Sequence, residues 1–175
     1  MMKAVIFAGG SIDSYKKVKK YLEGSSLIIC ADSGVEHAFN MGIEPDLLVG
    51  DMDSISSASL EKANKLGIER QQFPSEKDCT DTELALDIAL KKGADEAIIL
   101  GALGDRPDHS LANIFLMVGF KKLGLEVKLA DRNWDVFNRR SCGNSREKGR
   151  YSFADPHKFR SLRGRDLEPV LSLER

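Results

Sequence analysis

The chain lacks most features that mark membrane, secreted or metal-cluster proteins. No apolar run in its 175 residues approaches the roughly 20 residues needed to span a bilayer, and the N-terminus does not have the layout of a signal peptide. The three cysteines, Cys30, Cys79 and Cys142, lack metal-site spacing, and an odd number does not favour a disulfide framework. We therefore expect a cytoplasmic protein, with Cys30 as a small core residue at the end of an apolar strand.

The chain also lacks an excess of charge. Its net charge of −1 gives no reason to expect nucleic acid or an anionic membrane as a partner. It has no GxGxxG fingerprint, Walker A sequence or GxSxG elbow, and no Cys/His metal cluster. What it does have is 42% apolar residues, enough for the core of one domain, or of one domain plus a small appendage.

Strand and helix signals alternate over the first 131 residues. Short apolar runs alternate with amphipathic helical patterns, most of which end at a glycine. We expect strands at 3–8, 26–31, 47–49, 97–100 and 127–130, and helices at 14–22, 34–41, 57–66, 80–92 and 110–123. Strands separated by helices imply parallel crossovers. The sequence therefore predicts an α/β fold: a Rossmann-like parallel sheet with helices on both faces.

Polar loops follow four of the predicted strands. They are Gly9-Gly10-Ser11, Ala31–Gly34, Gly50–Ser54 and Gly101–Arg106. In sheets of this kind ligands bind beyond the carboxyl ends of the strands. Four such loops at one edge therefore predict a binding site there. The Gly9-Gly10-Ser11 loop is a candidate phosphate cradle, although the motif is weak by itself.

Asp51 and Asp53 give the clearest chemical indication in the sequence. They lie one residue apart directly after an apolar strand, and strand alternation would place both carboxylates on the same side of the backbone. Two carboxylates that close repel each other unless a cation lies between them, and Mg²⁺ prefers oxygen ligands. The pair therefore indicates a metal site; the alternative is a polar turn at the end of the strand.

Another polar group precedes the helix predicted from residue 80. Thr80 and Glu83 form a capping-box pattern, which explains both residues without a ligand. That pattern does not explain Lys77 and Asp81. A cation and a carboxylate near a helix N-terminus can hold a phosphate and its metal.

The loop after residue 100 adds further candidates. Arg106 can bind a phosphate with two parallel hydrogen bonds. Asp108 could instead cap the helix predicted from Ser110. His109 is more typical of a hydrogen-bonded structural residue than of a base, and His37, on a helix face, is a weaker candidate still.

Taken together, these segments resemble the thiamine pyrophosphokinase (thiamine diphosphokinase) family. The resemblance covers about residues 2 to 137. The matching segments, in the family's order, are Ala31–Gly34, Pro45–Ser54, Lys77–Glu83 and Gly101–His109. The resemblance implies transfer of pyrophosphate from ATP to the hydroxyl of thiamine, which gives thiamine diphosphate and AMP.

The resemblance also implies a cofactor and a set of site residues. It implies Mg²⁺, with Asp51, Asp53 and Asp81 as the metal ligands. The implied catalytic residues are Asp51, Asp53, Asp81, Arg106 and Asp108. The implied nucleotide and phosphate contacts are Asp32, Lys77, Thr80, Gly104, Arg106 and His109. Catalysis would rest mainly on positioning and electrostatics, so a strong base is not required; Asp78 and Asp108 are the candidates.

The resemblance ends where the family has a second, β-sandwich domain. In the family two subunits pair as a homodimer, and thiamine lies near the junction. From Asn138 to Arg175 this chain has eight Arg and two Lys, against three Arg and thirteen Lys before that point. The tail carries ten basic and five acidic residues, and the rest sixteen basic and twenty-two acidic. A basic nucleic-acid arm, a disordered segment and a foreign segment all fit this composition.

We expect residues 1–131 to form the catalytic domain that binds nucleotide and Mg²⁺. Residues 132–175 would be a remnant of the thiamine-binding β domain, shifted by a +1 frameshift or poorly ordered from about residue 138. The predicted partners are thiamine and ATP, without nucleic acid or membrane, and dimerisation is left open by this tail. The alternatives are a nucleotide- or thiamine-binding protein without turnover, and another Mg²⁺-dependent phosphoryl enzyme with Asp51 as nucleophile.

Overall fold

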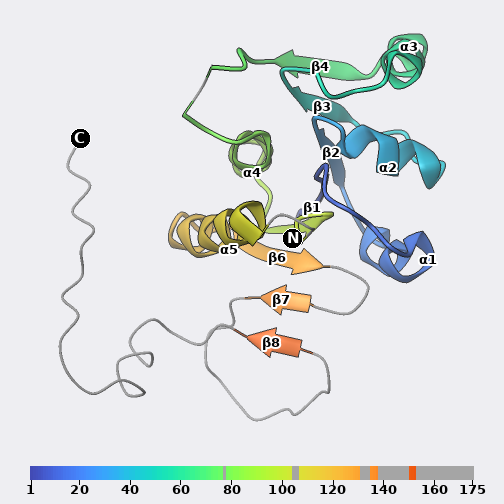
Figure 1. Cartoon of the computed structure of the whole chain (residues 1–175). Helices are drawn as coiled ribbons and strands as arrows, with labels where there is room; N and C mark the ends of the chain where they lie inside the picture. Colours follow the sequence, from blue (N-terminus) through green and yellow to red (C-terminus); the bar gives the residue numbers. More distant parts are fainter. Residues whose placement is uncertain (77, 104–106, 131–134, 138–149, 153–175) are drawn as a thin grey trace, which may run out of the picture.

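The structure, a computed structural model, describes residues 1–76, 78–103, 107–130, 135–137 and 150–152. Its centre is a parallel sheet whose six strands are ordered β4-β3-β2-β1-β5-β6 (Figure 1). Their bounds are β1 Lys3–Phe7, β2 Leu27–Ala31, β3 Leu47–Gly50, β4 Glu69–Gln72, β5 Glu96–Leu100 and β6 Glu126–Ala130. Two short strands extend the sheet beyond β6: β7 (Asp135–Phe137) runs antiparallel to it and β8 (Arg150–Ser152) runs parallel to β7. The predicted parallel α/β fold is confirmed.

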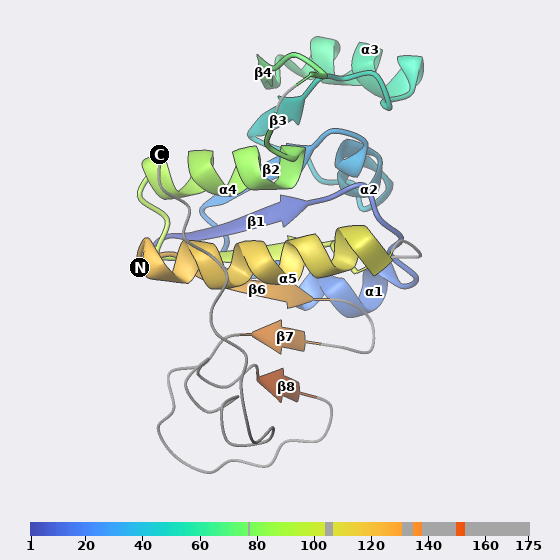
Figure 2. The same cartoon turned by 60° about the vertical axis from the view of Figure 1, so that its left-hand side comes forward.

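Helices cover both faces of this sheet. On one face lie α4 (Asp81–Lys91) and α5 (Pro107–Lys122). On the other lie α1 (Tyr15–Val18), the short 3₁₀ turn η1 (Lys19–Leu22), α2 (Gly34–Asn40) and α3 (Ser57–Leu66) (Figures 1 and 2). Successive strand residues point to opposite faces, so β1, β2, β3, β5 and β6 each contribute side chains to two separate apolar cores.

The strand β1 shows how these cores are filled. Ile6 packs toward α4 and α5, whereas Val5 and Phe7 pack toward α1 and α2, and all three are fully buried. Cys30 lies in the second core with no exposed surface, which confirms its prediction as a core residue. Burial raises the pKa of its thiol far above the usual range, so the thiol stays protonated.

The short strands β7 and β8 were not predicted, and three elements within the first 131 residues also differ from the sequence prediction. The strand β4 was not predicted, because Glu69-Arg70-Gln71-Gln72 has no apolar residue; it is an edge strand paired only with β3. The predicted helix at 14–22 consists of one α-helical turn followed by a 3₁₀ turn. The helix α5 begins at Pro107, three residues earlier than predicted. Proline suits the first helical position because its missing N–H would have no partner there.

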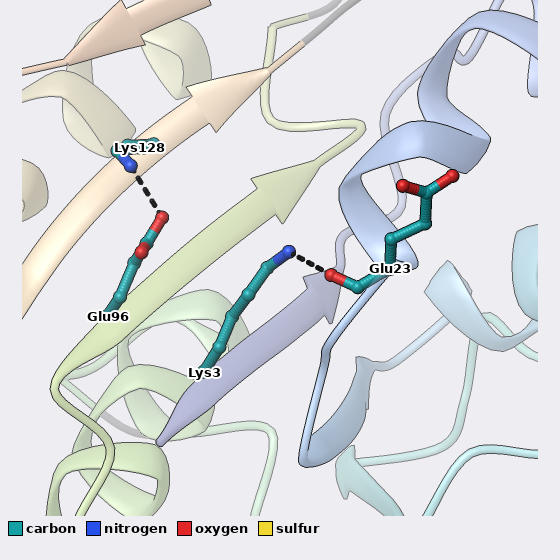
Figure 3. Close-up of polar contacts among 4 residues, drawn as sticks. All are labelled: Lys3, Glu23, Glu96 and Lys128. Atoms are coloured by element: carbon teal, nitrogen blue, oxygen red, sulfur yellow. Dashed lines mark hydrogen bonds and ion pairs between the residues drawn. The ribbon is translucent and has the colours of Figure 1, made fainter. Parts of the chain in front are cut away.

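Two lysines on the α1/α2 side of the sheet are held by local contacts (Figure 3). Lys3 Nζ donates to the carbonyl oxygen of Glu23 at 2.8 Å, and Lys128 Nζ lies 2.6 Å from Glu96 Oε1. Lys3 and Glu96 open their strands, at the end opposite the polar loops. These contacts therefore belong to the scaffold. Among the residues that the structure describes, no helix is both long and apolar enough to cross a membrane.

Candidate functional site

A pocket of about 690 Å³ opens at the carboxyl ends of the central strands. The strand order reverses between the neighbouring strands β1 and β5. From β1 the chain adds β2, β3 and β4 on one side, and from β5 it adds β6 on the other side. A crevice at such a reversal is where open α/β sheets bind ligands. Residues of all four predicted loops line the pocket, together with residues before and at the start of α4 and in the first two turns of α5. They are Ala8–Ser11, Ala31–Ser33, Asp51, Ser54, Ser75, Cys79–Thr82, Gly101, Ala102, His109, Ala112 and Asn113. The predicted convergence of the four loops is thus present.

One side of the pocket, here called the glycine wall, consists of Gly9, Gly10 and Gly101. The Gly10 N–H donates to the carbonyl oxygen of Gly101 at 3.0 Å, which joins the loop after β1 to the loop after β5. Gly101 has φ +71°, and a Cβ there would lie 2.6 Å from the carbonyl oxygen of Ala8. A Cβ at Gly9 would contact Ser33 Oγ, so a side chain there would require Ser33 to change its rotamer. At Gly101 a side chain is excluded by contact with backbone atoms, so this part of the wall consists of backbone.

Four aspartates at the pocket are here called the acidic wall: Asp32, Asp51 and Asp81, which line the pocket, and Asp53, which lies beside Asp51. Carboxylate oxygens of Asp32, Asp51 and Asp53 all lie within 4.8 Å of one another. Asp32 Oδ1 is buried and has no hydrogen-bond partner among the described residues. A buried carboxylate oxygen without a donor is costly unless a cation or water satisfies it.

The charge of this wall acts on Asp53. A hydrogen bond with Asp51 and the charge of Asp51, followed by smaller contributions from Asp32 and Asp81, raise the pKa of the exposed Asp53 carboxyl above its usual value. The negative charges of Asp51, Asp32 and Asp81 thus disfavour the ionised form of Asp53. Such a cluster is a favourable place for a divalent cation with oxygen ligands.

Asp51 and Asp53 come together by a different route from the one predicted. The strand β3 ends at Gly50, and Met52 has φ +71°, so the backbone turns instead of continuing to alternate. The Asp53 N–H donates to Asp51 Oδ1 at 3.1 Å, which closes this turn. Ser54 Oγ donates to Asp32 Oδ2 and joins the turn to the loop after β2. The polar turn and the proposed metal site are therefore the same feature.

Asp81 reaches the acidic wall from the start of α4. Thr80 Oγ1 accepts a hydrogen bond from the Glu83 N–H at 3.2 Å, so the predicted cap is present and α4 begins at Asp81. A Cβ built on Gly50 would lie 3.2 Å from Asp81 Oδ1 and 3.1 Å from Asp32 Cβ. Asp81 is therefore beside the cluster, whereas the three carboxylates that meet within 4.8 Å are those of Asp32, Asp51 and Asp53.

Of the remaining predicted residues, three are described by the structure and three are not. His109 lines the pocket from the first turn of α5. Asp108 lies in the same turn, with Oδ2 3.9 Å from His109 Nε2, so it does not precede the helix as a cap in the way predicted from a start at Ser110. Asp78 is exposed. Lys77, Gly104 and Arg106 lie outside the described residues, as does the tail from 138 except for β8.

Sequence reasoning missed the side chains that hold the loops. Glu36 on α2 accepts hydrogen bonds from Ser59 Oγ at 2.6 Å and from the Ser56 N–H at 3.1 Å. Burial alone would raise the pKa of Glu36, but the hydrogen bonds from Ser59 and Ser56 and the nearby His37 lower it on balance. Buried Asn113 on α5 donates to the carbonyl oxygen of Ala102 at 2.9 Å. Neither residue belongs to a motif; both lie within helices, where sequence spacing gives no hint of a loop contact.

Known proteins are similar to this chain in sequence and in fold. A family model described as "Thiamin pyrophosphokinase, catalytic domain" matches residues 18–129. The thiamine pyrophosphokinase of Bacillus subtilis is 35% identical over 132 residues, which is 75% of this chain and 62% of that protein. A crystal structure of a Bacillus subtilis thiamine pyrophosphokinase has a TM-score of 0.66 at 33% identity, covering 74% of this chain and 61% of that one. The Candida albicans thiamin pyrophosphokinase shares the fold at 17% identity, with a TM-score of 0.67 and coverages of 78% and 60%.

The chain thus spans less than two thirds of the length of these relatives. The residues matched by the family model contain the strands β2 to β5, most of β6 and all four residues of the acidic wall. On the match of the family model and the identity to a curated relative, the chain belongs to the thiamin pyrophosphokinase family.

Proposed function

We propose that the chain is a thiamine diphosphokinase, which transfers pyrophosphate from ATP to the hydroxyl of thiamine and releases AMP. The observation that carries the proposal is the acidic wall, which faces a pocket at the strand reversal in a chain of this family. A nucleotide with its metal ion matches both sides of the pocket. The glycine wall leaves room for phosphates, and the acidic wall attracts the cation that accompanies them.

The residues of the acidic wall fit Mg²⁺. All the donors are carboxylate oxygens, which suit a hard cation, and Asp32 Oδ1 has no other partner among the described residues. Asp51, Asp53 and Asp81 would hold the ion as the family resemblance implies, and we add Asp32 because its carboxylate lies in the same group of three. When bound, Mg²⁺ neutralises phosphate charge and aligns the phosphoryl group for in-line attack.

The chain's own residues would act mainly by positioning. The cap at Thr80 starts α4 beside the acidic wall, so the positive end of that helix lies next to the pocket and favours an anionic ligand. His109 lines the same pocket, which supports the proposal that it contacts the nucleotide. The same contacts are proposed for Lys77, Gly104 and Arg106, and Asp78 and Asp108 remain the candidate bases. Positioning and electrostatics can supply most of the catalysis in phosphoryl transfer.

Product analysis tests this function directly. The full chain is incubated with MgATP with and without thiamine, and nucleotides and thiamine species are separated by chromatography. We expect AMP and thiamine diphosphate in equal amounts, and only when thiamine is present. Release of ADP or inorganic phosphate without thiamine, together with an acid-stable or trappable phosphate on Asp51, would instead identify the alternative phosphoryl enzyme. Binding of MgATP or thiamine without any product would identify a binding protein.

We also propose that the composition change near Asn138 reflects a +1 frameshift and reduces turnover. The basis is the abrupt exchange of Lys for Arg in the last 38 residues. The nucleotide sequence of this region decides the frame, and the same assay on a frame-restored chain measures the effect. Equal turnover of both chains would contradict an impaired tail, while leaving the proposed reaction intact. A homodimer, expected from the family, is tested on both chains by light scattering.

A further inference from the structure

Three side chains form a continuous series that ends at the glycine wall. Asn40 Nδ2 donates to Tyr15 Oη at 3.3 Å, Tyr15 Oη lies 2.9 Å from His37 Nδ1, and His37 Nε2 lies 2.8 Å from the carbonyl oxygen of Gly10. Asn40 and His37 belong to α2, Tyr15 opens α1, and Gly10 lines the pocket. The series therefore reaches from two helices to a loop of the site.

The direction of each bond follows from the last one. A carbonyl oxygen can only accept, so His37 Nε2 must carry a hydrogen and donate it to Gly10. In the neutral imidazole Nδ1 then accepts, which makes the Tyr15 hydroxyl its donor. That hydroxyl oxygen remains free to accept from the Asn40 amide. All three bonds are thus satisfied by a single tautomer, and Tyr15 and Asn40 select it.

The peptide groups of Gly10 are held from two sides. The Gly10 N–H donates to the Gly101 carbonyl oxygen at 3.0 Å, and the Gly10 carbonyl oxygen accepts from His37 at 2.8 Å. The first bond joins the loop to β5 and the second joins it to α2. A glycine has the widest conformational freedom of any residue, so its orientation depends on such contacts.

We propose that His37 is a positioning residue which, oriented by Tyr15 and Asn40, fixes the Gly9–Ser11 loop in the conformation that receives the nucleotide phosphates. The nature of the ligand rests on the proposed function, whereas the fixing of the loop does not. Holding the loop before binding removes the cost of ordering it afterwards, so affinity and not fold should respond most to its loss.

The first test measures the loop itself, on the full chain labelled with ¹⁵N. The imidazole resonances of His37 are expected to show a protonated Nε2 and an acceptor Nδ1. In His37→Leu, amide exchange of Gly10 and Ser11 should rise about tenfold relative to wild type, as expected for the loss of a hydrogen-bonded tie. In His37→Gln, whose amide N–H can reach the same carbonyl, the rise should be within about threefold.

The second test measures MgATP affinity by calorimetry. We expect His37→Leu to weaken binding about tenfold, and Tyr15→Phe about threefold because the ring remains but no longer donates to Nδ1. His37→Gln should restore most of the affinity. The matched control is Phe39→Leu on the same helix. The ring of Phe39 lies under Lys62 Nζ, and Phe39 makes none of these three hydrogen bonds. It should change stability but not the affinity.

The two measurements separate the failure of this inference from the failure of the proposed function. If wild type does not bind MgATP, the proposed function is wrong, and the exchange of the loop amides still decides whether His37 fixes the loop. If His37→Leu raises exchange at Gly10 no more than Phe39→Leu does, the inference is overturned. It is overturned equally if His37 proves to carry its hydrogen on Nδ1.

Discussion

The two sides of the pocket are built on opposite principles. The glycine wall has no charge, and hydrogen bonds between backbone groups and from His37 hold it in place. The acidic wall places three carboxylates within 4.8 Å of one another with Asp81 beside them, leaves one buried oxygen unsatisfied by any described residue and raises the pKa of Asp53. The first wall is held by hydrogen bonds among the described residues, whereas the second concentrates negative charge, which the proposed Mg²⁺ would offset. The difference teaches that one wall is set by backbone contacts and that the other is marked by the repulsion between its carboxylates.

The sharpest test of the acidic wall is Asp51→Asn. Asn Oδ1 can still accept from the Asp53 N–H, so the turn should survive. Turnover should fall at least about a hundredfold, since a ligand of the proposed metal loses its charge. The control is Asp46→Asn, because Asp46 Oδ2 also accepts a backbone N–H, from Ile28 at 2.7 Å, but at the other end of the sheet. Unfolding of Asp51→Asn, or equal loss of turnover in the control, would indicate a structural turn only.

A substitution in the glycine wall should destabilise the fold by a steric clash and not by a change of charge. Gly101→Ala places a Cβ 2.6 Å from the Ala8 carbonyl oxygen at φ +71°. Gly24 has the same φ, but nothing lies within 4 Å of its Cβ position, so Gly24→Ala isolates the cost of the backbone conformation. We expect losses in the free energy of unfolding of about 3 kcal/mol for Gly101→Ala and about 1 kcal/mol for Gly24→Ala in chemical denaturation. Equal losses would mean that the loop adapts.

Glu36 joins α2 to the start of α3, and its substitution should have a smaller effect. Glu36→Gln removes the charge that accepts from Ser56 and Ser59, with an expected loss of about 1 kcal/mol. The fold lowers the pKa of Glu36, so this contribution is present above the unfolded pKa and is lost as the pH falls through the folded pKa. Denaturation of wild type and variant between pH 7 and 3 should therefore converge in acid. A constant difference would contradict the charged hydrogen bonds.

Asp53→Asn should produce the smallest change, and in the opposite direction. The fold raises the pKa of Asp53, so its favourable contribution is present below the unfolded pKa and is lost as the pH rises through the folded pKa. At neutral pH the charged Asp53 is therefore unfavourable, and Asp53→Asn should raise the melting temperature slightly in EDTA. In Mg²⁺ the wild type should gain stability that the variant does not. A gain of the same size in both would place the ion elsewhere.

Sequence patterns predicted the scaffold better than the geometry of the site. Apolar runs located β1, β2, β3, β5 and β6, because buried parallel strands must be apolar on both faces. The strand β4 was not predicted because it forms by backbone pairing with β3. The pattern of its side chains, which are all polar, does not indicate that pairing. The early start of α5 was readable from Pro107, whose place at a first helical position is a known preference.

Within the site, the sequence located the loops but not the contacts between them. Asp51 and Asp53 meet through a left-handed Met52, which is uncommon for a residue with a side chain and cannot be read from its neighbours. The proximity of Asp32 to this pair depends on the pairing of β2 with β3. The bond from His37 to Gly10 spans 27 residues and depends on how α2 packs against β1. Such contacts belong to the assembled sheet and to no single segment.

The strand β4 has a consequence for the behaviour of the chain in concentrated solution. As the outermost strand on its side, it presents unpaired backbone groups that a strand from another molecule could extend. Its four side chains, Glu69, Arg70, Gln71 and Gln72, are all polar, and three of them are exposed. Charged and amide groups on both faces give a foreign strand no apolar surface to cover. The polar side chains of β4, because of which the strand was not predicted, therefore protect this edge of the sheet against aggregation.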